Sequence, residues 1–321
     1  MARAARQDTI PDIGSPPLGC TWERYVETLI LEHGGLTALT QLLIRRAGKN
    51  TELPDDPGSI ERALRRLRSR GNEPGGQYGR WLLKHFGVPA PLEQTAKWMG
   101  QYHSRFSDLP RSLRESQLWL WDRPPIAESS AGGWIQLGLA SVALERGEFA
   151  VAAERQKRAA GLSGAGRVEA ELLAARLESQ QGVDVFERLR RVEALVAELP
   201  RGADRECYRA RVLDQLAYAH SHAKPARHAE ARKLYASIAD DDSTAAFARF
   251  RRHHGLAYCE WKLGRTARAA RHAELAAEHA GDAGLLRFRA QALSLLAAIA
   301  PKRAKALETR IKSIRAATFD E

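Results

Sequence analysis

The chain has 321 residues, of which 44% are hydrophobic, so it is long enough for two modest domains or one extended repeat array. Lys and Arg number 50 against 39 Asp and Glu, and the net charge of +11 favours a polyanionic partner such as DNA, RNA or an acidic protein surface. Three cysteines are too few for a disulfide framework, and no apolar run is long enough for a membrane helix. We therefore expect a cytoplasmic protein that has no membrane partner.

Residues 1–20 contain Pro and Gly and show no helical period, which predicts a flexible arm. They also lack the continuous apolar run of a secretory signal, which agrees with a cytoplasmic location. Residues 21–97 follow as a predicted basic helical head. Its first helix spans 21–35, with Thr21 as the cap, and a second helix spans 36–48.

The segment from Gly58 to Gly87 is the most basic part of this head, with seven Lys or Arg residues against two Glu. Ser59 is predicted to cap a helix over 59–70, in which apolar residues recur at helical spacing and arginines occupy the other faces. The predicted buried stripe consists of Ile60, Ala63, Leu64 and Leu67. A short helix over 78–86 follows after a turn. The predicted nucleic-acid-binding residues are Arg62, Arg65, Arg66, Arg70, Arg80 and Lys84.

Helices of this size are typical of the helix-turn-helix unit, which reads DNA with its second helix. In one assignment, the helix over 36–47 is the supporting helix and the helix over 59–70 reads DNA. In the other, the helix over 59–70 is the supporting helix and the helix over 78–86 reads DNA. Both connections, of about eleven and seven residues, are longer than the turn of three or four residues usual for this motif. The alternatives are a helical cap whose arginines face water and a surface for an acidic protein partner.

Residues 98–130 form a predicted bridge that is rich in aromatic side chains. Such side chains are too large to leave in water, so we expect the bridge to pack the head against the repeats that follow. The aromatic residues are Trp98, Tyr102, Phe106, Trp119 and Trp121. His103, Ser104 and Asp108 lie too close together in the sequence to converge as a catalytic triad.

From residue 131 to the end, the chain is rich in Ala, Leu and Arg and contains a repeated pattern. Segments 138–162 and 255–279 each have Leu-Ala, a Gly eight residues after the Leu, an Ala five residues later and another Ala seven further on. The small residues permit close packing of a helix pair, and Gly147 and Gly264 end the first helix of each pair. The pattern resembles that of the tetratricopeptide repeat (TPR).

Two further segments, 171–199 and 212–238, fit the pattern less completely, and helices over 284–299 and 302–316 would cap the array. The resemblance covers more than half of the chain. It implies a right-handed superhelix over 131–321, with a concave groove for a peptide or protein and no catalysis. Because each repeat contacts mainly its neighbours, a fragment from about 127 to 321 is expected to fold alone.

In such an array the first helix of each pair lines the groove, so its polar residues form the predicted partner site. The predicted groove residues are Gln136, Ser141 and Glu145 in the first unit, Asp214, Tyr218 and His222 in the third, and Arg252, Tyr258 and Lys262 in the fourth. For any single one of them, the alternative is an ordinary solvated position on a helix.

Sequence motifs of catalysis and cofactor binding are absent: the chain has no P-loop, GxGxxG, CxxC or HExxH pattern. The pairs His220/His222 and His253/His254 do not share a helix face, so no metal and no cofactor is expected. We do not expect an enzyme.

The combined prediction is an all-α protein, with a basic helical head followed by a TPR-like α-solenoid. Its predicted function is that of a cytoplasmic DNA-binding regulator whose body senses a peptide or protein, or dimerises. Some bacterial regulators join a helix-turn-helix head to such a body, and the order of parts is similar here. The alternative is a TPR adaptor or scaffold in a larger protein or ribonucleoprotein assembly, without direct nucleic-acid binding.

Overall fold

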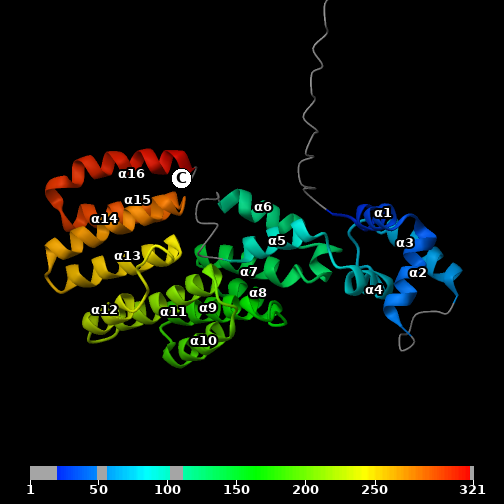
Figure 1. Cartoon of the computed structure of the whole chain (residues 1–321), viewed down its shortest axis with the longest axis horizontal. Coiled ribbons are helices and arrows are strands. Elements are labelled where there is room, and N and C mark those ends of the chain that lie inside the picture. Colours follow the sequence, from blue (N-terminus) through cyan, green and yellow to red (C-terminus); the bar gives the residue numbers. More distant parts are fainter. Residues whose placement is uncertain (1–19, 49–55, 102–110, 319–321) are drawn as a thin grey trace, which may run out of the picture. The chain divides into compact units, whose positions relative to one another are not determined.

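The computed structural model describes residues 20–48, 56–101 and 111–318, and every regular element in these ranges is a helix (Figure 1). The all-α prediction is confirmed. Apart from Cys20, the predicted flexible arm lies outside the described residues. Among the described helices, none combines the length and the apolar character needed to cross a membrane.

Internal contacts divide the chain into two units. The first, which we call the head unit, comprises the described residues up to Phe86 together with Arg123–Ile126. The second, the body unit, comprises Gly87–Asp122 and the residues from Ala127 onward. The helix that follows Gly87, α5 (Ala90–Gly100), therefore belongs to the body unit, although most of its residues fall within the head predicted over 21–97.

Four helices form the head unit: α1 (Trp22–His33), α2 (Leu36–Ala47), α3 (Pro57–Arg68) and α4 (Gly76–Phe86). The Thr21 side chain caps α1, as predicted, by accepting a hydrogen bond from the backbone N–H of Arg24. The predicted Ser59 cap of α3 is wrong. Asp56 caps this helix instead, because Pro57 already has helical geometry and the Asp56 carboxylate accepts from the next two free N–H groups.

Trp22 is the centre of the head unit and is fully buried. Its indole Nε1 donates to the carbonyl of Glu73 at 2.8 Å. A β-carbon on Gly75 or Gly79 would lie 2.1 Å or 2.7 Å from the indole ring, so glycine is required at both positions. The glycine-rich turn before α4 thus lets the backbone pass directly beside Trp22. The stripe predicted for α3, from Ile60 to Leu67, is buried as expected.

The body unit begins with α5 (Ala90–Gly100) and α6 (Arg111–Trp121) and continues after a short 3-10 turn at Ile126–Glu128, which spans the unit boundary. Five helix pairs follow. They are α7 (Gly132–Glu145) with α8 (Phe149–Arg158), α9 (Ala165–Gln180) with α10 (Phe186–Glu198), α11 (Ala203–His222) with α12 (His228–Ala236), α13 (Ala246–Lys262) with α14 (Thr266–Asp282), and α15 (Leu286–Ile299) with α16 (Ala304–Thr318). A second 3-10 turn, Pro301–Arg303, precedes α16.

Each helix of these pairs packs against the next one along the chain. The first helices of the pairs, α7, α9, α11, α13 and α15, also pack against one another in order and form a continuous row. Gly147 and Gly264, each two residues after the end of α7 or α13, have φ values of +75° and +77°, as the pattern predicted. The repeated alanines are buried because the paired helices approach closely there: Ala152, Ala269 and Ala276 are fully buried.

Helix α7 is covered on nearly every side, because α5 and α6 pack on it as well as α8 and α9. A β-carbon on Gly138 would lie 2.9 Å from Leu118 of α6, so α6 approaches the α7 backbone closely.

Two aromatic residues of the predicted bridge differ in their burial. Trp121 is buried, but Trp119 is 49% exposed, so the expectation that it is buried is wrong. Tyr102 and Phe106 lie outside the described residues.

Candidate functional site

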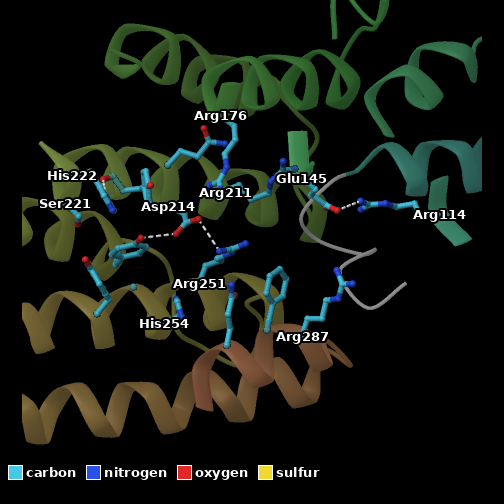
Figure 2. Close-up of a pocket in the computed structure, with 17 residues that line it drawn as sticks. Arg114, Glu145, Arg176, Arg211, Asp214, Ser221, His222, Arg251, His254 and Arg287 are labelled. Carbon is cyan, nitrogen blue, oxygen red and sulfur yellow. Dashed lines mark hydrogen bonds and ion pairs between the residues drawn. The ribbon is translucent and has the colours of Figure 1, made fainter. Parts of the chain in front are cut away.

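A cavity of about 590 Å³ lies along the row of first helices in the body unit (Figure 2). Its walls come from α7, α9, α11, α13 and α15, with one residue each from α6 and α12. The lining residues are Arg114, Glu145, Arg176, Arg211, Asp214, Gln215, Tyr218, Ser221, His222, Tyr235, Arg251, His254, Gly255, Tyr258, Arg287, Phe288 and Gln291. On α11 they recur every three or four residues, so one face of this helix looks into the cavity.

Positive charge dominates this cavity, which five arginines and two carboxylates line. Arg114 pairs with Glu145 at 2.8 Å, and Arg251 pairs with Asp214 at 3.2 Å. A third guanidinium, that of Arg211, forms a salt bridge with the buried carboxylate of Glu169. The cavity therefore keeps an excess of guanidinium over carboxylate groups.

Arg176 is the guanidinium best placed to receive an anion. It lies over the ring of Tyr218 with 5.9 Å between Cζ and the ring centroid, and Tyr218 in turn stacks on His222 at 3.8 Å. Among the described residues, Arg176 forms no ion pair with a carboxylate. The positive charge of Arg176 is thus available to an anion, next to the aromatic rings of Tyr218 and His222.

Arg251 and Asp214 are held in place by their surroundings. The Tyr235 hydroxyl donates to Asp214 Oδ1 at 2.9 Å, and the guanidinium of Arg251 lies 4.8 Å from the centroid of the Phe288 ring. Burial and the Asp214 charge raise the pKa of Tyr235 well above its usual value, so the phenol keeps its proton and remains a donor. The ion pair at the centre of the cavity is therefore preorganised rather than mobile.

His254 lies beside this pair and is neutral at pH 7. Its pKa is lowered to about 4, mainly by burial and also by the charge of Arg251, while Asp214 acts in the opposite direction. A neutral imidazole supplies one donor and one acceptor. The cavity can consequently hydrogen-bond an uncharged polar group next to its guanidinium groups.

Five of the nine predicted groove residues lie in the cavity: Glu145, Asp214, Tyr218, His222 and Tyr258. The other four do not line it. Gln136 and Ser141 are buried inside the covered helix α7, where Gln136 donates to Asp122 Oδ1 at 2.6 Å.

Arg252 and Lys262 lie elsewhere on α13. Arg252 precedes Tyr258 by six residues, a rotation of about 240° around the helix, so it points to a different face. There it donates to the carbonyls of Ala236 and Ile238 at the end of α12. Lys262 is exposed at the end of α13, with its Nζ 4.6 Å from the centroid of the Trp261 ring.

The arginines of the cavity were not among the predicted site residues, although the helical spacing contains the signal for them. Arg211 lies three residues before Asp214, and Arg251 lies seven before Tyr258, so each shares the face of a predicted residue. Extending the stripe toward the amino terminus by one turn on α11 and by two turns on α13 finds both. Arg114 has no such signal, because α6 lies outside the repeated pattern.

The predicted nucleic-acid-binding residues of the head unit are all exposed. Arg62, Arg65 and Arg66 lie on the side of α3 that faces away from the buried stripe. Arg62 and Arg65 are engaged by acidic neighbours on the same segment, Arg62 by Asp56 at 3.5 Å and Arg65 by Glu61 at 3.2 Å, and Arg70 donates to the carbonyl of Pro74. Among the described residues, the remaining three form no ion pair. These are Arg66, Arg80 and Lys84.

No protein-family model matches this chain, and neither a curated protein nor a solved structure matches it. Function is therefore inferred from the chemistry of the cavity and from the charged surface of the head unit.

Proposed function

We propose that this protein is a non-enzymatic binding protein of the cytoplasm, whose body unit is a TPR-like array that captures an acidic segment of a partner protein. The observation that carries this proposal is the arginine-rich cavity along the row of first helices. Guanidinium groups bind carboxylates through parallel hydrogen bonds, and the flat rings of Tyr218 and Tyr258 offer packing surfaces for apolar side chains.

An extended peptide suits this cavity better than a compact anion does. The guanidinium groups are contributed by five separate helices, α6, α9, α11, α13 and α15, so they are spread along the row. Arg114 and Arg251 already have carboxylate partners. The neutral His254 can pair with a backbone amide of the ligand. The proposed ligand is therefore a segment that combines Asp or Glu with apolar residues.

The test is a fluorescence-anisotropy titration of the chain with labelled peptides, one rich in Asp, Glu and Leu and one with Lys in place of the acids. We expect binding of the acidic peptide only, and weaker binding at higher salt. Arg176→Gln should weaken it by roughly tenfold, since hydrogen bonds to a charged group contribute about 1.5–3 kcal/mol. Arg191→Gln, an exposed change on α10 outside the cavity, serves as the control. Equal affinity for both peptides would refute the proposal.

A second proposed activity is DNA binding by the head unit. It is favoured by the exposed cationic side chains that lack an acidic partner. Arg66 lies one turn beyond Arg62 on α3, and Arg80 and Lys84 are one turn apart on α4. Helix α3 contains no Asn or Gln, which favours phosphate contacts of its arginines over base readout. Together with a sensing body unit, this makes the protein a DNA-binding regulator.

This activity is tested by titrating labelled DNA and RNA duplexes with the chain at two salt concentrations. The double variant Arg62→Gln/Arg66→Gln should bind more weakly, with a salt slope reduced by about one for each lost phosphate contact. Circular dichroism should show an unchanged helix content, since both side chains are exposed. If the unmodified chain does not bind either duplex at low salt, the head unit does not grip nucleic acid and the protein is an adaptor.

A further inference from the structure

Three histidines and one aspartate meet where α13 and α14 pack against the loop that follows α12. His253 of α13 is 3% exposed, and its ring stacks on those of His272 and His279 of α14, with 5.3 Å between centroids in each case. Nε2 of His253 lies 3.0 Å from Oδ1 of Asp240 in the loop. One oxygen of Asp240 and one ring nitrogen each of His253 and His279 all lie within 4.8 Å of one another.

We propose that Asp240, His253 and His279 bind one divalent transition-metal ion of the zinc class. Two imidazole nitrogens and one carboxylate oxygen are a donor set that zinc accepts, with water or a further side chain as the fourth ligand. The three side chains come from three different elements, so the bound ion would join the α12–α13 loop to both helices of the fourth pair.

A second observation, on the side chain of His279, independently supports a metal ion at this place. His279 is 6% exposed, and its Nε2 is buried without a hydrogen-bond partner among the described residues. Its other ring nitrogen, Nδ1, lies 3.8 Å from Oδ2 of Asp282. A buried polar atom without a partner is costly, and a metal ion would supply the partner. A carboxylate beside the second nitrogen is the usual outer support of a zinc-bound histidine.

The spacing around His253 also fits a metal. Two ligand atoms on a tetrahedral zinc lie about 3.3 Å apart, given bonds of about 2.0 Å. The separation of 3.0 Å between His253 Nε2 and Asp240 Oδ1 is already close to this value. The ion would take the position of the proton that these two atoms share. Nδ1 of His253 faces Nδ1 of His272 at 3.0 Å, so His272 can accept its proton and fix the ring orientation.

The surroundings favour a transition metal over calcium or magnesium. Hard cations require several oxygen ligands, whereas this cluster offers one carboxylate and imidazole nitrogens. Two arginines also lie close to the carboxylate: the Nε atoms of Arg249 and Arg252 are each 3.5 Å from an oxygen of Asp240. Their charge weakens purely electrostatic binding of a cation, so affinity must come from the nitrogen ligands.

The experiment is isothermal titration calorimetry of the untagged, chelator-treated chain with Zn²⁺, accompanied by the visible spectrum with Co²⁺. We expect one ion per chain and the intense visible absorption of tetrahedral Co²⁺. Asp240→Asn and His279→Gln should each weaken Zn²⁺ binding by at least about tenfold. His222→Gln, which changes a histidine of the cavity, should leave both readouts unchanged.

Asp240→Asn is expected to leave the protein folded, because the Asp240 side chain is in a loop and 32% exposed. A change in its metal binding can therefore be separated from unfolding. A fall in affinity for this variant at unchanged helix content supports the proposal. Absence of binding at millimolar Zn²⁺ overturns it. So does stoichiometric binding that both Asp240→Asn and His279→Gln retain in full, since the ion then sits elsewhere.

Discussion

Gly255 and Tyr235 are in contact so close that a β-carbon on Gly255 would lie 2.2 Å from the Tyr235 ring. Tyr235 cannot move aside freely, because its hydroxyl donates to Asp214 and its side chain is buried. Gly255 on α13 therefore determines the position of Tyr235, the residue that α12 contributes to the cavity wall.

Gly255→Ala should displace Tyr235 and break its hydrogen bond to Asp214. We expect a loss of stability of about 1–3 kcal/mol from overpacking, together with weaker peptide binding. Urea unfolding and the anisotropy titration measure the two effects. Gly281→Ala is the matched control: the atoms nearest to its β-carbon would belong to the Arg289 side chain, at 3.5 Å, and alanine favours the helix. A Gly255→Ala variant as stable as this control would contradict the described contact.

The ion pair between Arg211 and Glu169 is almost completely shielded from water, with 3% and 1% of the side chains exposed. Arg211→Met should destabilise the body unit by roughly 3–5 kcal/mol, because it leaves the Glu169 charge buried without a partner. Arg211→Met/Glu169→Leu should recover much of this loss. Chemical denaturation of the three proteins checks the order. Arg158→Met, which breaks an exposed pair with Glu154, should change stability little.

Stability should fall as the pH is lowered from 6.5 toward 4, partly because of His254. Its pKa of about 4 in the folded state lies below the value of 6.5 in the unfolded chain, so the unfolded chain binds more protons in this window. Full stability is present above pH 6.5, and up to about 3 kcal/mol is lost by pH 4. Burial also lowers the pKa of His253, His272 and His279, which act in the same direction.

The contribution of His254 is isolated by comparing urea midpoints of the chain and of His254→Gln at pH 7 and pH 5. The midpoint should fall less for the variant than for the unmodified chain. Identical shifts in both proteins would show that His254 does not titrate as its environment predicts.

Gly79→Ala should destabilise the head unit, since the new methyl group would lie 2.7 Å from the Trp22 indole. We expect a loss of about 1–3 kcal/mol. Tryptophan fluorescence during urea unfolding, together with loss of nucleic-acid binding, reports the change. Gly58→Ala at the start of α3 should be tolerated, because its nearest neighbour outside the adjacent residues is 3.4 Å away. If Gly79→Ala leaves the unfolding curve unchanged, Trp22 does not pack as described.

Local patterns in the sequence were sufficient to predict most of the helices and much of their packing, but not α5 and α6. The stripe from Ile60 to Leu67 and the alanines such as Ala269 are buried because apolar and small residues recur at the helical period. Gly147 and Gly264 end their helices because a left-handed residue is needed there. The cap of α3 was misplaced because Asp56 and Ser59 are both good caps, and only Pro57 distinguishes them.

The candidate sites depended on contacts between distant segments, and these were harder to predict. Asp214, Tyr218 and Tyr258 lie in the cavity because they face the row of first helices. Gln136 and Ser141 belong to such a helix too, but α5 and α6 cover it, and no local pattern reveals that cover. The cluster around His253 joins residues up to 39 positions apart, from Asp240 to His279, whereas the expectation of no metal rested on neighbouring histidine pairs.

The packing of α5 and α6 on α7 determines where the body unit can be truncated. An array of stacked helices has two terminal faces, and an uncapped one is apolar and promotes aggregation. Here α5 and α6 close the face of α7 that carries Trp134 and Gly138, which contact Gly100 of α5 and Leu118 of α6. A fragment that starts at 127, which the repeat pattern predicts to fold alone, would expose this face to water because it lacks α5 and α6. The smallest piece of the body unit suited to expression and crystallisation therefore starts at Gly87, ahead of α5.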